Sequence, residues 1–130
     1  FVDGDTFWVN DGSPKGLKLR LIGINSPEPR AYFGREKEPY GKAASVHMIE
    51  LLGSSQVRLE FDVDSLDQYG RTLAYVFLED KTFINEKMVE DGYAQVATYP
   101  PNVRYVGVFI EAERRARKEN RGLWEDDDVE

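Results

Sequence analysis

Polar side chains suited to phosphate chemistry lie at the ends of the predicted strands and turns. They include carboxylates, two amides and two arginines: Asp3, Asp5, Arg20, Asn25, Ser26, Glu28 and the segment Asp67-Gln68-Tyr69-Gly70-Arg71. Carboxylate, amide and carbonyl oxygens are the ligands preferred by a hard cation such as Ca²⁺. Two arginines can grip a phosphate with paired N–H groups, and a further carboxylate can activate water. A cation, two arginines and a base are the components of phosphodiester hydrolysis.

Each of these short motifs also has an ordinary structural explanation. Asp3-Gly4-Asp5 alone is more often a hairpin turn, and Tyr69-Gly70-Arg71 alone is a common turn. Arg20 on a strand is usually a solvated surface residue. It is the occurrence of all of them in one chain that favours a functional site.

Composition limits the alternatives. The chain has 130 residues, enough for one domain with a single core, and 41% of them are hydrophobic, which excludes a disordered chain. There is no cysteine and only one histidine, so thiolate and multi-histidine zinc sites are excluded. No stretch of the sequence is apolar over the length of a membrane span.

The net charge of −7 is concentrated at the C-terminus. Five of the last six residues are acidic, and without them the net charge is −2. A nearly neutral body attracts nucleic acid only weakly, because non-specific binding depends on basic surfaces. Binding of a polyanion would therefore depend on a few local arginines or on a metal ion.

Hydrophobic periodicity predicts short strands and three helices. We expect a hairpin over 1–9, a turn at 11–14, a strand over Leu17 to Ile24 and a long exposed loop over 25–41. Helices are predicted over 42–52, 84–91 and 103–119, and strands over 56–61, 71–78 and 93–97. Short, mostly antiparallel strands with added helices indicate an α+β domain around a small closed barrel.

Several side chains have simpler, structural interpretations. His47 lies at the edge of the apolar stripe of its predicted helix, without an acidic or nucleophilic neighbour in a motif, and we interpret it as structural. A basic stretch near the C-terminus could bind nucleic acid, but favourable interaction with the helix dipole explains it more simply. Pro27 and Pro29 bias Ser26 and Glu28 towards extended geometry, which would stiffen the predicted catalytic loop.

Five segments, taken together, resemble the staphylococcal nuclease family in order and spacing. They are Val2-Asp3-Gly4-Asp5-Thr6, Arg20-Leu21-Ile22-Gly23-Ile24-Asn25-Ser26-Pro27-Glu28, Tyr40-Gly41-Lys42-Ala43-Ala44, Asp67-Gln68-Tyr69-Gly70-Arg71-Thr72-Leu73-Ala74-Tyr75-Val76 and Gly122-Leu123-Trp124. The resemblance implies a five-stranded OB-fold β-barrel with three helices. It also implies a Ca²⁺-dependent endonuclease that cleaves DNA and RNA and leaves 3′-phosphate ends.

The resemblance further implies a nuclease domain over residues 1–124, a frayed acidic tail over 125–130, and a first strand that begins before residue 1. A monomer is expected, and secretion or attachment to the cell envelope is the localisation that the family suggests.

The resemblance assigns a role to each matching position. Asp5 matches a calcium carboxylate, Ser26 stands where a backbone carbonyl binds the calcium, and Asp3 matches an acid behind these ligands. Glu28 matches the proposed general base, and Arg20 and Arg71 match the two arginines that hold the scissile phosphate. Tyr69 and Tyr99 match tyrosines that contact the nucleotide, although the segment before Tyr99 is one residue shorter than in the family.

Two positions depart from the family pattern. Asn25 stands in place of a second calcium aspartate, so the predicted site keeps a ligand oxygen but loses one negative charge. Gln68 replaces a lysine near the nucleotide. The alternative is therefore a weak or inactive module that binds nucleic acid or protein, because some family members kept the fold and lost the chemistry. The base and both arginines argue against that alternative, and Asn25 argues mildly for it.

Overall fold

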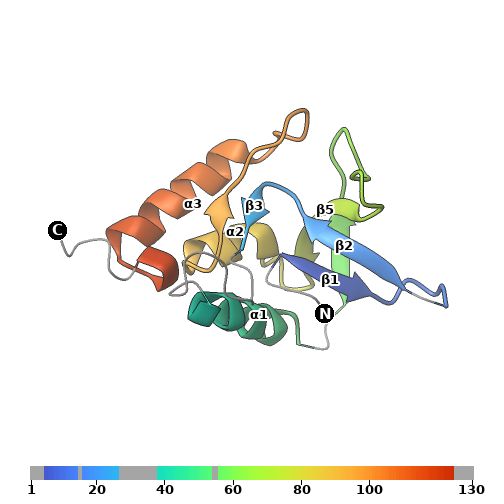
Figure 1. Ribbon diagram of the computed structural model, residues 1–130. Helices are drawn as coiled ribbons and strands as arrows, with labels where there is room; N and C mark the ends of the chain where they lie inside the picture. The colour runs from blue at the N-terminus through green and yellow to red at the C-terminus, as the bar shows by residue number, and fades with distance from the viewer. Residues whose placement is uncertain (1–4, 15, 27–37, 54–55, 125–130) are drawn as a thin grey trace.

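The computed structural model describes residues 5–14, 16–26, 38–53 and 56–124, with the side chains of 38–41 left aside (Figure 1). Its strands are β1 (Thr6–Val9), β2 (Leu17–Leu21), β3 (Ile24–Asn25), β4 (Val57–Glu60), β5 (Thr72–Leu78) and β6 (Gln95–Val96). Its helices are α1 (Glu38–Leu52), α2 (Ile84–Glu90) and α3 (Val106–Lys118), followed by a 3₁₀ turn over Gly122–Trp124. The predicted α+β class with three helices is confirmed. No helix in this part of the chain is long and apolar enough to cross a membrane.

The main sheet has the strand order β1-β2-β5-β4. β1 pairs antiparallel with β2, and β4 pairs antiparallel with β5, whereas β2 and β5 run parallel with Leu19 opposite Thr72 and Leu21 opposite Ala74. The side chains of these four residues are buried, so the alternation along each strand leaves Arg20 on the opposite face.

The predicted strand over 17–24 is interrupted at Gly23. Gly23 has a φ of +86°, and a Cβ atom there would collide with the ring of Phe109. The chain therefore turns away after β2, and β3 pairs with β6 in a separate two-stranded sheet. The expectation of a closed five-stranded barrel was wrong for the described residues, which form six strands in two sheets.

One continuous core joins the sheet to the helices. Met48 of α1, Met88 of α2 and Phe109 of α3 are buried with Leu21 and Tyr75 of the sheet. Figure 1 shows α2 between the strands and α3, with α1 below them. These contacts confirm the apolar faces predicted for the first and last helices.

Helix boundaries differ from those predicted. Helix α1 begins at Glu38, four residues earlier than expected, since the first turn of a helix tolerates a proline such as Pro39. Helix α3 begins at Val106, three residues later than expected. The segment before it is bonded to the loop after β4, where the backbone N–H of Arg104 donates to Asp62 Oδ2 over 3.0 Å.

Both ends of the predicted nuclease domain can be compared only in part with the structure. Of the predicted hairpin over 1–9, residues 1–4 lie outside the described part of the chain, and β1 uses the remainder as one strand paired with β2. The acidic tail over 125–130 also lies outside it.

His47 has a structural environment. Its Nε2 atom lies 2.6 Å from Asp91 Oδ2, and its ring lies on Tyr93 with centroids 4.5 Å apart. Its Nδ1 atom also lies 3.9 Å from Glu50 Oε1, three residues on in the same helix. Asp91 is distant in sequence, so the sequence pattern does not reveal this second acidic contact. The contact joins α1 to the end of α2.

Candidate active site

The predicted metal and phosphate ligands within the described residues lie directly before β1, near the end of β2, at the end of β3 and directly before β5. Arg20 lies opposite Leu73 in the parallel β2–β5 pair. Arg71 comes directly before β5, two residues before Leu73. Strand pairing thus places the two arginines on neighbouring segments of the sheet.

Arg20 is fixed by acceptors from its own neighbourhood. Its Nη1 atom donates to the carbonyl oxygens of Leu21 and Ile24 over 2.7 and 2.8 Å, and its Nη2 atom donates to Asn25 Oδ1. A guanidinium has five N–H donors. Among the described residues, the N–H of Nε and one N–H of Nη2 therefore remain for another ligand. These two donors lie on one edge of the guanidinium and match two oxygens of a phosphate.

Arg71 is held through its Nε atom, whereas Arg20 is held through its Nη atoms. Its Nε atom donates to Asp67 Oδ2 over 2.7 Å, while Asp67 Oδ1 accepts the backbone N–H groups of Tyr69 and Arg71, each over 2.9 Å. Burial raises the pKa of the Asp67 carboxyl, but these bonds from Arg71 and Tyr69 outweigh it and hold the pKa below its usual value. Asp67 therefore stays charged, and within the described chain both Nη groups of Arg71 are left for a ligand.

Asp5 is the buried carboxylate of the site, with 7% of its surface exposed. Its Oδ2 atom accepts the backbone N–H of Ser26 over 2.8 Å and lies 3.6 Å from Arg20 Nη1, and its Oδ1 atom accepts the hydroxyl of Thr6 over 3.1 Å. These contacts tie the beginning of β1 to the end of β3. The predicted ligands Asp5, Asn25 and Ser26 are thus neighbours.

The oxygen atoms around Asp5 have features of a cation site. The Ser26 hydroxyl is buried and has no hydrogen-bond partner in the described chain, which leaves a polar atom beside Asp5 for a further ligand. The available atoms are oxygens, as a hard cation requires. However, no cluster of three or more acidic, histidine or cysteine side chains occurs among the described residues. The residues therefore fit a hard cation that is held weakly.

Asn25 has partners on both sides. Besides the bond from Arg20 to its Oδ1 atom, its Nδ2 atom donates to the hydroxyl of Tyr99 over 3.4 Å. Asn25, the predicted metal ligand, thus also connects Arg20, the arginine predicted to bind phosphate, to Tyr99, the tyrosine predicted to contact the nucleotide.

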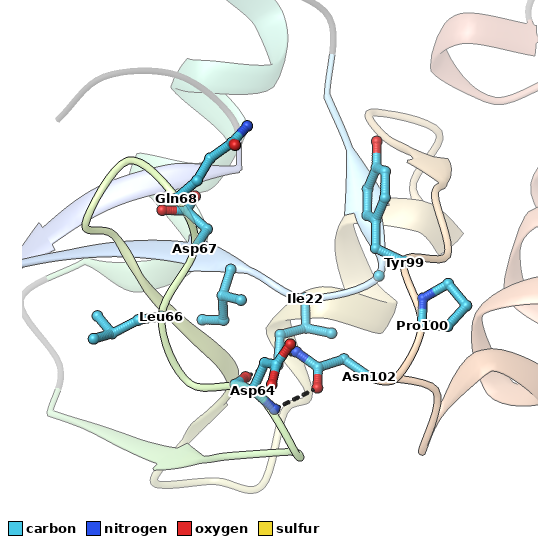
Figure 2. A pocket seen from close by; sticks show the side chains of 10 residues that line it. Ile22, Asp64, Leu66, Asp67, Gln68, Tyr99, Pro100 and Asn102 are labelled. Carbon is cyan, nitrogen blue, oxygen red and sulfur yellow. Dashed lines mark hydrogen bonds between the residues drawn. The ribbon is translucent and has the colours of Figure 1, made fainter.

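A cleft of about 340 Å³ lies beside these groups. One wall is formed by Asp67 and Gln68 in the loop between β4 and β5, and the other by Tyr99 and Pro100 before α3, with Ile22 between them (Figure 2). Tyr69 and Tyr99 are largely exposed, at 73% and 62%. Exposed aromatic rings beside a cleft are suited to stacking on flat ligands such as nucleobases.

The structure brings together Asp5, Arg20, Asn25, Ser26 and Tyr99, and separately Arg71 and Tyr69. The predicted base Glu28 and the acid Asp3 lie outside the described residues. Sequence reasoning missed the role of Asp67 as the partner of Arg71, although the spacing of four residues was a signal for it. It also missed Asn102, for which the sequence offered no signal beyond a Pro-Pro-Asn turn.

Comparisons with a family model and with known proteins agree with one another. The family model for staphylococcal nuclease homologues matches residues 18–126. The chain is 41% identical over 125 residues to the thermonuclease of Staphylococcus intermedius, covering 95% of this chain and 72% of that protein. It is 40% identical over 123 residues to the thermonuclease of Staphylococcus hyicus, covering 95% and 71%. It is also 35% identical over 125 residues to endonuclease YncB of Bacillus subtilis, covering 95% of this chain and 58% of that protein.

Proposed function

This chain belongs to the staphylococcal nuclease family, and we propose that it is a calcium-dependent endonuclease that hydrolyses phosphodiester bonds of DNA and RNA to 3′-phosphate ends. The observation that carries the proposal is the placement of the two arginines on neighbouring segments, since Arg20 lies opposite Leu73, two residues after Arg71. Each guanidinium is held by internal bonds and keeps N–H donors for a phosphate. Relatives named thermonuclease and endonuclease support the same activity.

The residues would divide the work as follows. Arg20 donates from Nε and Nη2, and Arg71 from its Nη groups, to the oxygens of the phosphate, whose negative charge increases during attack. Glu28 orients or deprotonates the attacking water, as the resemblance implies. Tyr69 and Tyr99 contact the nucleotide beside the cleft.

Asp5, the Asn25 amide oxygen and the Ser26 carbonyl would hold the metal ion, with Asp3 behind them. A bound Ca²⁺ supplies positive charge that offsets the charge developing on the phosphate. With two nearby carboxylates, Asp5 and Asp3, and a neutral amide at Asn25, the affinity should lie near the weak end of protein calcium sites, about 10⁻⁴–10⁻³ M.

A second candidate function is a module that binds nucleic acid without cleaving it. The observation that favours it is the bond from Arg20 to the Asn25 oxygen, which places a positive group against one of the proposed metal ligands. In this alternative the cleft and its exposed tyrosines would bind a strand, and no cleavage would follow.

A cleavage assay separates the two functions. The purified protein is incubated with plasmid DNA and with a 5′-labelled RNA oligonucleotide, in millimolar Ca²⁺ or in excess chelator. We expect cleavage of both substrates in Ca²⁺, none in chelator, and fragments whose 3′-phosphate a phosphatase removes. Full activity in chelator would contradict metal dependence. Binding without cleavage at any Ca²⁺ concentration would favour the module.

The substitution Asn25→Asp tests the assignment of Asn25. A carboxylate can accept from both Arg20 and the hydroxyl of Tyr99, so the local geometry is kept while one negative charge is added. We expect the Ca²⁺ concentration for half-maximal activity to fall about tenfold, as calcium affinity depends on the number of charged ligands. The measurement is initial cleavage rate against Ca²⁺ concentration. An unchanged calcium dependence would show that Asn25 is not a ligand.

A further inference from the structure

Asn102 joins the two walls of the cleft through its side chain. Its Oδ1 atom accepts the backbone N–H of Asp64 over 2.8 Å, and its Nδ2 atom donates to the backbone carbonyl of Asp64 over 2.8 Å. Figure 2 shows the two residues meeting at one end of the cleft. Asn102 is 6% exposed, and a buried amide needs hydrogen-bond partners within the protein. Here its oxygen and its nitrogen each bond to Asp64 of the facing segment. We call this pair of bonds the Asn102 clasp.

On one side, the clasp leads directly to Arg71. Beyond Asp64 the loop folds back on itself, because Leu73 N donates to Ser65 O over 2.9 Å and Asp67 N donates to Arg71 O over 3.0 Å. The far end of this folded loop carries the Asp67–Arg71 pair. Its near end is bonded to Asn102 at Asp64, so the clasp sets the position of the folded loop relative to the facing turn.

On the other side, the clasp leads to Tyr99. The backbone N–H of Asn102 donates to the carbonyl of Tyr99 over 3.1 Å, which closes the turn between them. Tyr99 and Pro100 of this turn form the wall of the cleft opposite Asp67 and Gln68. Asn102 is therefore bonded both to the turn that carries one wall and to the loop that carries the other.

A neighbouring contact reinforces the anchor without replacing it. Asp62 Oδ2 accepts the hydroxyl of Tyr75 over 2.7 Å and the backbone N–H of Arg104 over 3.0 Å. These bonds fix the beginning of the loop to the sheet and to the segment before α3. They act before Asp64, and Ser65 and Leu66 after it pair with the beginning of β5, so the Asn102 clasp is what ties this paired loop to the turn that carries Tyr99.

We propose that Asn102 is a positioning residue for catalysis, which fixes Arg71 and Tyr99 relative to each other across the cleft. The proposal rests on the proposed function. Its physical basis is that a misplacement of a reacting group by about 1 Å can cost about 10²-fold in rate. Asn102 would act through Arg71, because its amide oxygen and its amide nitrogen both bond to Asp64 of the loop that leads to Arg71.

The test compares two substitutions at this position with two controls. Asn102→Ala removes both bonds of the clasp, whereas Asn102→Asp keeps an acceptor for the Asp64 N–H and loses the donor to its carbonyl. Val103→Ala changes the adjacent exposed residue, and His47→Ala breaks the contact with Asp91 that ties α1 to α2. Steady-state cleavage gives kcat and KM. Amide hydrogen exchange at Asp64 and Arg71 reports on the loop directly.

We expect kcat to fall by about 10- to 100-fold in Asn102→Ala and by a smaller factor in Asn102→Asp. The Asp64 amide should lose its protection in Asn102→Ala and keep part of it in Asn102→Asp. Both controls should retain kcat within about twofold at a temperature where circular dichroism shows all variants folded. A general loss of stability would not lower kcat and the protection of the Asp64 amide in parallel, more in Asn102→Ala than in Asn102→Asp, while both controls stay unchanged.

Two outcomes overturn the proposal in different ways. If the parent cleaves and Asn102→Ala cleaves with the same kcat, or if His47→Ala loses as much, Asn102 is not a positioning residue and the proposed function stands. If the parent itself never cleaves nucleic acid, the proposed function is wrong and this inference is wrong with it.

Discussion

Arg71→Lys is expected to lower kcat about 100-fold or more, with little change in the affinity for an oligonucleotide. In the proposed function Arg71 would perform two tasks at once, because Nε binds Asp67 while the Nη groups remain for the phosphate. A lysine has one ammonium group and no planar fork, so it can satisfy Asp67 or reach the phosphate, but it cannot do both. The lost donors face oxygens whose charge increases in the transition state, and such a loss lowers kcat rather than binding.

The matched control is Arg114→Lys, the same substitution on α3, where Arg114 is exposed and pairs only with Glu111 among the described residues. Its kcat should equal that of the parent. Circular dichroism should show both variants folded, since Arg71 lies at the outer end of β5 and not in the core. A parental cleavage rate in Arg71→Lys would mean that Arg71 does not touch the reacting phosphate.

The sequence predicted the positions of those site residues that follow from the pattern of their immediate neighbours in the chain. Arg20 alternates with the buried Leu19 and Leu21, so its outward position follows from the strand pattern. Arg71 follows a glycine turn at the beginning of a strand, which indicates an exposed position beside the sheet. Neither inference required knowledge of which strands pair, whereas the placement of Arg20 opposite Leu73, two residues after Arg71, did.

The contacts that the sequence did not reveal join residues far apart in the chain. Asn25 contacts Tyr99, Asn102 binds Asp64, and His47 binds Asp91. Nothing in a single sequence marks such pairs, because an asparagine in a turn and an asparagine that joins two loops have the same local neighbours.

The barrel prediction failed for a different reason. The run Leu21-Ile22-Gly23-Ile24 is apolar and predicts that the strand beginning at Leu17 continues to Ile24. A glycine inside a strand, however, often marks a bend or a close approach. Here the close approach is to the ring of Phe109, a residue of α3. The signal for the break was present, but its cause lies in the tertiary packing.

Asp5→Asn is expected to reduce kcat/KM by about 10³-fold, at Ca²⁺ concentrations that saturate the parent. Asp5 is the described carboxylate of the proposed metal site, and its neighbour Asn25 is already neutral. The substitution therefore leaves amide, hydroxyl and carbonyl oxygens, whose combined affinity for a hard cation is poor. The metal's contribution to transition-state charge is worth several kcal/mol, which corresponds to this factor.

The substitution should leave the local structure intact, which makes the result interpretable. An asparagine oxygen can accept the Ser26 N–H as Asp5 Oδ2 does, and its amide N–H₂ can then face Thr6, whose hydroxyl can accept as well as donate. The control is Asp80→Asn, which removes the same charge from an exposed turn where Asp80 also accepts a backbone N–H. Calcium binding by titration calorimetry and cleavage should both be lost in Asp5→Asn and retained in Asp80→Asn. Equal calcium binding in both variants would mean that the ion is held elsewhere, and that Asp5 serves only to tie β1 to β3.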